Sequence, residues 1–429
     1  MKEQIFVLKG IIVHTPAFDN LEYHLNEYVI CENGKVQGIF KELPEEYKDI
    51  KVYDYSDKFI IPGMSDMHLH APQYGFRGMG MVYFGEQWKN WFPKYSLPEE
   101  RRYADMEYAT KAYERLVDDI LKTTTTTRAV VFATIHRQAS EMLMDKFNEA
   151  GLGAYIGKVN MDRNSLEGYQ ETTEESLSET ERWILETKDK YELVKPIITP
   201  RYIPSCTDEL MIGLGKLAAK YNVPCMSHLS ESPRELEWVK ALRPDINFYA
   251  EAYDKAGVFG SVTPSLMAHV VYPCDEEYEL MKNRDVMVAH CPNSNMNTTG
   301  GSARVKEMMK DGIKVGLGSD VAAGPDLSLM RELTDAIRSS KALSKYSPKG
   351  EEVVLSLANA FYIATMGGGQ FFGKVGCFEK DYDFDAVVLD YKKLEDYIER
   401  DIDDRFERLV WLFKPELIEA KYVAGNRVL

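Results

Sequence analysis

The sequence predicts an α/β fold: a (β/α)8 TIM barrel joined to a composite β-sandwich domain that is formed from both chain termini. Short apolar segments alternate with longer amphipathic stretches from about residue 63 to residue 370, a pattern typical of parallel strands connected by helices. Residues able to ligate a metal follow several of these segments, and the catalytic residues of such barrels lie at the strand ends. We therefore expect a catalytic barrel of residues 63–370 and a second domain of residues 1–62 and 371–429.

The candidate barrel strands are eight apolar segments, at residues 60–68, 124–133, 154–159, 195–199, 223–227, 266–269, 286–289 and 315–318. Imidazole or carboxylate side chains stand at or just beyond the ends of four of them: His68, His70, His228, His269 and Asp320. Since the carboxyl ends of the strands share one rim of a barrel, we expect these side chains to lie together.

The two chain ends have the patterns of a sheet. Residues 5–13 are apolar and β-branched, and Asn33-Gly34 between two further apolar runs is a strong hairpin signal. Residues 386–389, 408–413 and 420–428 are expected as strands of the same domain. His14 and His24 stand among turn residues, where we expect them to be solvated.

Composition excludes several classes of partner and site. The formal charge of −16 and the absence of a basic stripe disfavour binding to nucleic acid or to an anionic membrane surface. The six cysteines contain no Cys-x-x-Cys pair, which disfavours a thiolate metal site and favours reduced thiols in a cytoplasmic protein. No apolar stretch is long enough to cross a bilayer or to act as a signal peptide, so a cytoplasmic location is the expectation.

The histidines and Asp320 predict a catalytic metal site. His68 and His70 are two residues apart on a predicted strand, so both imidazoles can face one point. With His228 and Asp320 they supply three nitrogen ligands and a carboxylate, a set that suits one zinc ion with a position left for water. Zinc lowers the pKa of such a water toward ~7, and Asp320 can orient it. The alternative for His68 and His70 is a pair of hydrogen-bonded core histidines.

Glu231 is the candidate proton carrier, because it follows His228 by three residues and can stand beside the metal without ligating it. The same segment also fits a helix start, with Ser230 or Ser232 as the cap, and the two interpretations are compatible. His269 is expected to polarise the substrate rather than to ligate. His290 is expected to order its loop, and His136 is a candidate for the pocket rim.

The motifs together resemble the amidohydrolase superfamily. The matching segments are Pro62-Gly63-Met64-Ser65-Asp66-Met67-His68-Leu69-His70, His228-Leu229-Ser230-Glu231, His290-Cys291-Pro292-Asn293-Ser294-Asn295, Gly318-Ser319-Asp320 and the closing Tyr422-Val423-Ala424-Gly425-Asn426. The resemblance spans nearly the whole chain and is closest to the mononuclear zinc deaminases, within them to the guanine deaminases. No lysine stands at the end of the fourth predicted strand as a bridging carbamate, which disfavours a binuclear site.

The resemblance implies a set of purine contacts. Gln73 in His70-Ala71-Pro72-Gln73-Tyr74 and the pair Arg201-Tyr202 match the family's base-reading segments, and Trp88 would help to close the pocket. An amide, a guanidinium and an aromatic ring suit the edge, the O6 carbonyl and the face of guanine. The family usually has phenylalanine where this chain has Tyr202. The alternatives are a surface Gln73 and an Arg201 that is tied to a neighbouring carboxylate.

The implied activity is the zinc-dependent hydrolytic deamination of guanine to xanthine and ammonia in purine catabolism, by a homodimer with one zinc per subunit. The residues expected to contact the purine are His70, Gln73, Trp88, Arg201, Tyr202, His228, Glu231 and Asp320. Two alternatives stay open. The first is another deaminase of the superfamily, acting on 8-oxoguanine, a pterin, a triazine or an adenosine derivative. The second, a barrel scaffold without activity, is disfavoured because every expected ligand and Glu231 are present.

Overall fold

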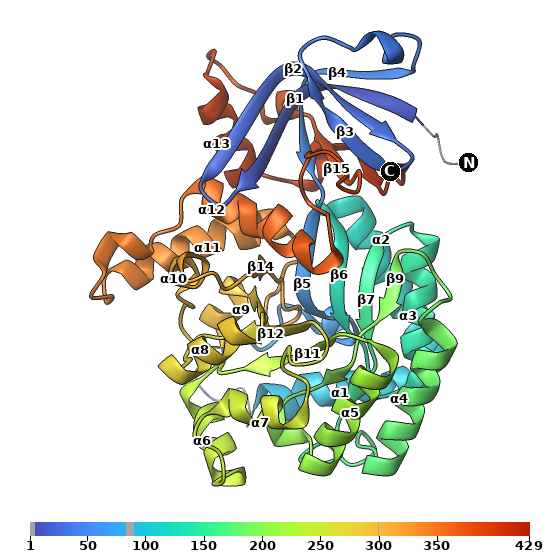
Figure 1. Ribbon diagram of the computed structural model, residues 1–429, viewed down its shortest axis with the longest axis vertical. Helices are drawn as coiled ribbons and strands as arrows, with labels where there is room; N and C mark the ends of the chain where they lie inside the picture. The colour runs from blue at the N-terminus through green and yellow to red at the C-terminus, as the bar shows by residue number, and fades with distance from the viewer. Residues whose placement is uncertain (1–4, 83–89, 299) are drawn as a thin grey trace.

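The computed structural model describes residues 5–82, 90–298 and 300–429. Figure 1 shows two regions: a sheet that combines blue N-terminal strands with red C-terminal segments, and below it a barrel with helices on its outside. None of the helices in these described ranges is long and apolar enough to span a membrane.

Eight parallel strands form the barrel, and each falls within or overlaps one predicted segment. They pair in two groups of four: β5 (Met64–His70), β6 (Thr126–Phe132), β7 (Gly153–Gly157) and β9 (Val194–Pro196), then β11 (Cys225–Leu229), β12 (Ser265–His269), β13 (Met287–His290) and β14 (Val315–Leu317). A parallel bridge between Ile198 and Cys225 joins the groups on one side. On the other side, Asp320 N–H donates to the His68 carbonyl at 2.8 Å. The ring is therefore closed, and the predicted barrel is confirmed. The short parallel pair β8 (Val159–Asn160) and β10 (Thr199–Pro200) extends it.

Amphipathic helices cover the barrel (Figure 1). α2 (Met106–Thr123) shows why they form: Asp105 caps its N-terminus, and its buried residues Tyr113, Leu116, Val117 and Ile120 recur at three- and four-residue spacing. The other helices are α1 (Leu97–Arg101), α3 (Arg137–Glu149), α4 (Thr173–Thr187), α5 (Asp208–Tyr221), α6 (Pro233–Leu242), α7 (Tyr249–Ala256), α8 (Asp275–Asn283), α9 (Pro292–Asn297), α10 (Val305–Lys310), α11 (Leu329–Ser344), α12 (Leu357–Tyr362) and α13 (Ile402–Trp411). Of these, α13 lies beside the sheet formed by the chain ends rather than on the barrel (Figure 1).

The chain ends form one seven-stranded sheet in the order β17-β16-β15-β4-β1-β2-β3. Its strands are β1 (Ile5–Ala17), β2 (Asn20–Glu32), β3 (Lys35–Phe40), β4 (Val52–Pro62), β15 (Ala386–Leu389), β16 (Ile418–Val423) and β17 (Asn426–Arg427). The predicted hairpin is present, with Asn33 at φ 53° and Gly34 at φ 80°, the left-handed pair that a tight hairpin turn requires. The expected combination of both termini in one β region is confirmed, and the boundaries at residues 62 and 371 stay a prediction.

Three local expectations were wrong. Residues 408–413 are not a strand but overlap the end of α13, whose buried Phe406, Leu409 and Val410 follow helical spacing. Residues 60–62 belong to β4 rather than to the first barrel strand. His14 is 2% exposed within β1 and His24 is half-buried within β2, so neither is a turn residue.

Two buried basic side chains connect the sheet to the barrel. Arg128 of β6 donates to both carboxylate oxygens of Asp385, at 2.7 and 3.0 Å, and to Asp383 at 3.1 Å. Lys421 of β16 donates to the carbonyls of Ile120, Leu121 and Thr126 at 3.0, 2.8 and 3.2 Å. The contacts to Ile120 and Leu121 satisfy carbonyls in the last turn of α2 that have no partner within the helix.

Candidate active site

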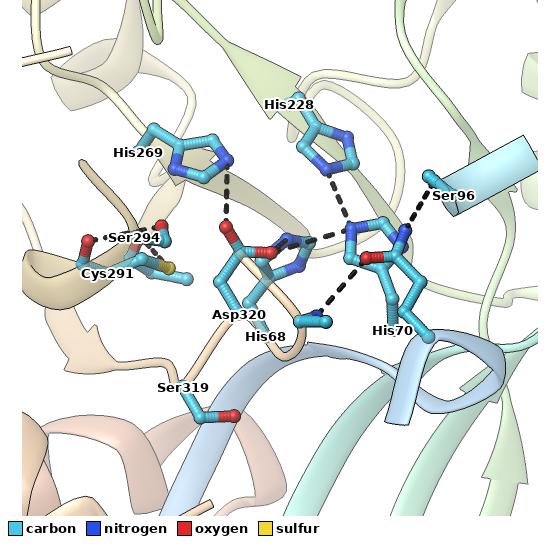
Figure 2. A network of polar contacts seen from close by, with 12 residues as sticks. His68, His70, Ser96, His228, His269, Cys291, Ser294, Ser319 and Asp320 are labelled. Atoms are coloured by element: carbon cyan, nitrogen blue, oxygen red, sulfur yellow. Dashed lines mark hydrogen bonds and ion pairs between the residues drawn. The ribbon is translucent and has the colours of Figure 1, made fainter. Parts of the chain in front are cut away.

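Four imidazoles and a carboxylate meet at the C-terminal rim of the barrel (Figure 2). His68 Nε2 lies 3.1 Å from Asp320 Oδ1, and His70 Nε2 lies 3.6 Å from the same oxygen. His70 Nε2 also lies 3.2 Å from His228 Nε2. All four side chains named here are buried or nearly so, and they come from β5, β11 and the residues after β14. The sequence prediction that they converge is confirmed.

The geometry of these side chains fits a divalent metal such as zinc. Two nitrogens bound to one tetrahedral zinc at 2.0–2.1 Å stand roughly 3.3–3.4 Å apart, close to the separation of the His70 and His228 Nε2 atoms. His228 Nδ1 lies 2.6 Å from the Arg201 carbonyl, so Nδ1–H donates there and leaves the Nε2 lone pair facing His70. Burial lowers the pKa of His68, His70 and His228, which keeps the rings neutral as metal ligands require.

The backbone at the strand ends is held in an uncommon conformation. Ser230, His269 and Asp320 have φ values of 51°, 75° and 47°, in the left-handed region that costs a residue with a Cβ roughly 1–3 kcal/mol. Asp66 secures one of these ends, because its carboxylate accepts hydrogen bonds from His68 N–H at 3.2 Å and from Ser319 N–H at 2.9 Å. The strain lies at or next to the functional side chains, where the surrounding structure compensates for it.

Glu231 and His269 stand next to His68, His70, His228 and Asp320, the candidate metal-ligand group. His269 Nε2 lies 4.0 Å from Glu231 Oε2 and 4.0 Å from Asp320 Oδ2, while its Nδ1 lies 2.9 Å from Asn295 Oδ1. Burial raises the pKa of Glu231. Burial opposes the charged form of His269, but the carboxylates of Glu231 and Asp320 outweigh it and leave the pKa of His269 raised. These directions suit a carboxyl that both accepts and returns a proton.

The segment after His228 serves two purposes, as the sequence allowed. Ser232 caps α6 by accepting a hydrogen bond from Glu235 N–H at 3.3 Å. The hydroxyl of Ser230 contacts the carboxylate of Glu277 instead. Glu231 therefore precedes the helix cap, and its side chain lines the cavity.

Gln73 and Arg201 belong to one buried network. Gln73 Nε2 donates to Glu100 Oε1 at 2.7 Å and to Ser96 Oγ at 3.1 Å, and Gln73 Oε1 accepts from Ala322 N–H at 3.2 Å. Arg201 Nη1 donates to Glu100 Oε2 at 2.6 Å. The surface alternative for Gln73 is wrong, because its side chain is buried. The carboxylate alternative for Arg201 holds, yet Arg201 lines the cavity as well.

The cavity next to the metal-ligand group collects most of the predicted residues. Its described lining is His70, Gln73, Trp91, Phe92, Arg201, Tyr202, His228, Glu231, Glu235, His269, Thr298, Asp320 and Ala323. His136 and His290 are not among these described lining residues. Trp88 lies outside the described residues.

Sequence reasoning missed four residues around this cavity. Glu100, in α1, and Ser96, the residue before α1, hold Gln73 and Arg201 in place, and no sequence motif marks either residue.

Glu235 accepts a hydrogen bond from Glu231 N–H at 2.9 Å and another from Tyr249 OH at 2.8 Å. Burial, together with the charge of Glu231, raises the pKa of Glu235 to about 7. The only sequence feature that could have indicated Glu235 is its position four residues after Glu231. Phe92 contributes an aromatic face, with Arg201 Cζ 5.5 Å from its ring centre.

A closed parallel barrel with neutral histidines, an aspartate and an adjacent buried carboxyl at its C-terminal rim defines a metal-dependent hydrolase of the barrel type. The model of the amidohydrolase family matches residues 59–418. A guanine deaminase from Dictyostelium discoideum is 34% identical over 449 aligned residues, covering 99% of this chain and 98% of its own length.

Two solved structures extend this comparison. A guanine deaminase from C. acetobutylicum with guanine bound in its active site superposes with a TM-score of 0.95 at 42% identity, covering 99% of this chain and 100% of that chain. An adenosine deaminase from Xanthomonas campestris with bound zinc, at 17% identity, TM-score 0.80 and coverage of 98% and 92%, shares the fold. The chain belongs to the amidohydrolase family and, within it, to the guanine deaminases.

Proposed function

We propose that this protein hydrolyses guanine to xanthine and ammonia. The observation that carries the proposal is the placement of a guanidinium, an amide and a proton-carrying carboxyl around one metal-ligand group. The likeness to a guanine deaminase that holds guanine supports the same substrate.

His68, His70, His228 and Asp320 would hold one zinc ion per chain. Their mutual distances and the neutral state of the rings support this assignment. When bound, the ion would supply a Lewis acid that makes water a nucleophile at neutral pH. Asp320 Oδ2, on the side of His269, would accept a hydrogen bond from the attacking water and orient it toward C2 of the base.

Glu231 would carry the first proton. As the water oxygen bonds to C2, the carboxylate takes one proton from the water and delivers it to N3 of the purine. The second water proton passes to the amino group, with Glu231 again as the carrier, and the C2–N bond breaks to release ammonia. His269, held by Asn295, would stabilise the charge that develops next to Glu231 and Asp320.

Arg201, Gln73 and Tyr202 would position the base. Arg201 uses two donors on Glu100 and Ser96 and keeps others in its fork for the O6 carbonyl. Both donors of Gln73 are engaged and its carbonyl oxygen accepts from Ala322 N–H, so the second lone pair of that oxygen is left to accept from a purine N–H. A base without the matching groups would leave buried polar atoms unpaired, which is how such a cavity discriminates.

The test is ammonia release from zinc-loaded protein supplied with guanine, 8-oxoguanine, guanosine or adenine in parallel. We expect rapid release from guanine and little from the others. Ammonia release from another of these compounds, with none from guanine, would mean that the protein is a deaminase of a different substrate. Absence of turnover on all of them, with zinc bound, would favour the scaffold.

We further propose that the protein acts as a cytoplasmic homodimer. The hollow lined by Tyr272, Met296 and Tyr346, whose side chains are exposed, supports a contact between two copies. Light scattering of the purified protein would test it. A monomer at micromolar concentration would contradict the dimer and leave the proposed reaction untouched.

A further inference from the structure

A second convergence of metal-ligating side chains lies on the terminal sheet. His14 of β1 is paired with Glu22 of β2 in the antiparallel register, and His24 is two residues further along β2, so it shares a face with Glu22. Figure 1 places this β1–β2 hairpin in the terminal sheet, apart from the strand ends of the barrel that carry the cavity. No step of the proposed reaction uses these residues.

The three side chains point their ligand atoms at one another. His14 Nε2 lies 3.4 Å from Glu22 Oε2, and His24 Nε2 lies 3.6 Å from the same oxygen. The three ligand atoms lie within 4.8 Å of one another. Ligands of one tetrahedral zinc stand roughly 3.3–3.4 Å apart, so the hairpin group is nearly as compact as the barrel group.

The opposite nitrogen of each ring already contacts another side chain. His14 Nδ1 lies 3.3 Å from the thiol sulfur of Cys377, and His24 Nδ1 lies 3.1 Å from Glu27 Oε2. If each Nδ1–H donates to its neighbour, both Nε2 atoms present lone pairs to the Glu22 carboxylate. Metal-bound histidines are characteristically oriented in this way, by an acceptor on the second nitrogen.

The contacts at the two Nδ1 atoms leave both Nε2 atoms available to a cation beside Glu22. His24 Nε2 is buried and lacks a hydrogen-bond partner among the described residues. In the Nδ1–H tautomer of both rings, two Nε2 lone pairs face one carboxylate, and a cation between them removes the repulsion.

We propose that His14, Glu22 and His24 bind a structural divalent transition-metal ion, zinc by ligand type, with water completing the coordination on the exposed side of Glu22. Two imidazoles and a carboxylate suit zinc, and the side chain of Glu22 is 40% exposed, which leaves room for that water.

The ion would stabilise the end of the hairpin where it meets the segment returning from the barrel. Cys377 belongs to that segment, and Thr15 Oγ1 lies 3.3 Å from Thr365 Oγ1 in the same contact. Asn359 Nδ2 also donates to the Phe18 carbonyl at 2.9 Å. Binding to the folded chain alone would raise its stability by mass action.

Metal content is the direct test. Protein stripped with a chelator, reloaded with zinc and dialysed against metal-free buffer should retain two zinc ions per chain by elemental analysis. Glu22→Gln and His24→Asn should each lower the content to one while turnover stays within twofold of wild type. Glu32→Gln, the same carboxylate change at the other end of β2, should retain two.

A variant with an empty barrel site, His68→Ala with His70→Ala, isolates the second site from the first. Titration of this variant with zinc should give one equivalent of binding in the micromolar range or tighter, together with a rise in thermal midpoint. If Glu22→Gln or His24→Asn fails to fold, this titration still tests whether a second zinc site exists. One zinc in wild type, or a second zinc that Glu22→Gln and His24→Asn both retain, overturns the proposal.

Discussion

The barrel rim and the β1–β2 hairpin bring together the same types of ligand, for a catalytic site in the barrel and a structural site in the hairpin. Each places two candidate ligands two positions apart on a strand, His68 and His70 in the barrel and Glu22 and His24 in the hairpin. Each also holds a histidine through its second ring nitrogen: His228 through the Arg201 carbonyl, His14 through Cys377. Ligand spacing alone therefore does not distinguish a catalytic group from a structural one.

The surroundings of the two groups differ. The barrel group borders a cavity with a guanidinium and an amide, and a buried carboxyl with a raised pKa stands next to it. The hairpin group lies against the body of the chain through His14 and opens to solvent at Glu22. Catalysis thus depends on a substrate cavity and a proton carrier in addition to the ligands.

The largest effect should come from removing a barrel ligand. His70→Ala is expected to lose the zinc of the barrel and to abolish detectable ammonia release, because both the Lewis acid and the orientation of water depend on it. Elemental analysis and an ammonia assay measure the two losses in one preparation. A variant that keeps full turnover without that zinc would refute the metal assignment.

Glu231→Gln separates the proton carrier from the ligands. The amide cannot accept and return a proton, so kcat should fall by roughly 10²–10⁴ while zinc content stays as in wild type. Unchanged turnover would exclude Glu231 from the mechanism, and loss of zinc would make it a ligand rather than a carrier. Glu237→Gln, on α6 close in sequence, is the control and should behave as wild type.

Glu100→Gln tests the hydrogen bonds that hold Arg201 and Gln73 at the cavity. The substitution leaves Arg201 buried without its charged partner, and removing one partner of a buried pair costs about 3–5 kcal/mol. We expect a lower thermal midpoint and a KM for guanine that rises more than kcat falls. Glu107→Gln, an exposed carboxylate paired with Lys111 on α2, is the control and should change neither. A wild-type KM in Glu100→Gln would show that the hydrogen bonds of Glu100 to Gln73 and Arg201 do not contribute to substrate binding.

Most of the fold and of the candidate metal-ligand group could be predicted from the sequence, because the patterns that indicate them are local. A strand that ends in histidines two positions apart is visible in the seven residues of β5, and apolar segments at regular intervals mark the other barrel strands. The helix α13 was misassigned because the apolar cluster at Leu409, Val410, Trp411 and Leu412 masks the helical spacing that begins at Phe406.

The missed parts depend on contacts between distant segments. Glu100 reaches Arg201 across 101 positions of sequence, and His14 meets Cys377 across 363 positions. Neither pairing has a local pattern. The burial of His14 could not be foreseen for the same reason, since the segment that covers it returns only after the whole barrel.

Lys421 links the two regions and should make stability depend on pH. Burial lowers its pKa to about 7, below the usual value of about 10.4, so the unfolded chain binds more protons between these limits. The contribution of Lys421 to stability should therefore rise with pH across this window, by at most about 1.4 kcal/mol per pH unit. Comparing denaturation of wild type and Lys421→Met from pH 7 to 10 isolates this slope. Parallel curves would show that the three carbonyls keep the ammonium charged.

The smallest effect on turnover should follow from Cys377→Ala, which distinguishes the two groups most finely. Removing the sulfur frees His14 Nδ1 and lets the ring adopt the other tautomer or rotate, so zinc affinity at the hairpin should fall about tenfold or more. Cys377→Ser keeps an acceptor and should recover much of that affinity, while kcat and KM stay at wild-type values in both variants. Equal affinity in wild type, the alanine variant and the serine variant would mean that the sulfur does not orient His14. A fall in kcat would instead mean that the hairpin and the barrel rim act on each other, and that their separation into a structural and a catalytic group is wrong.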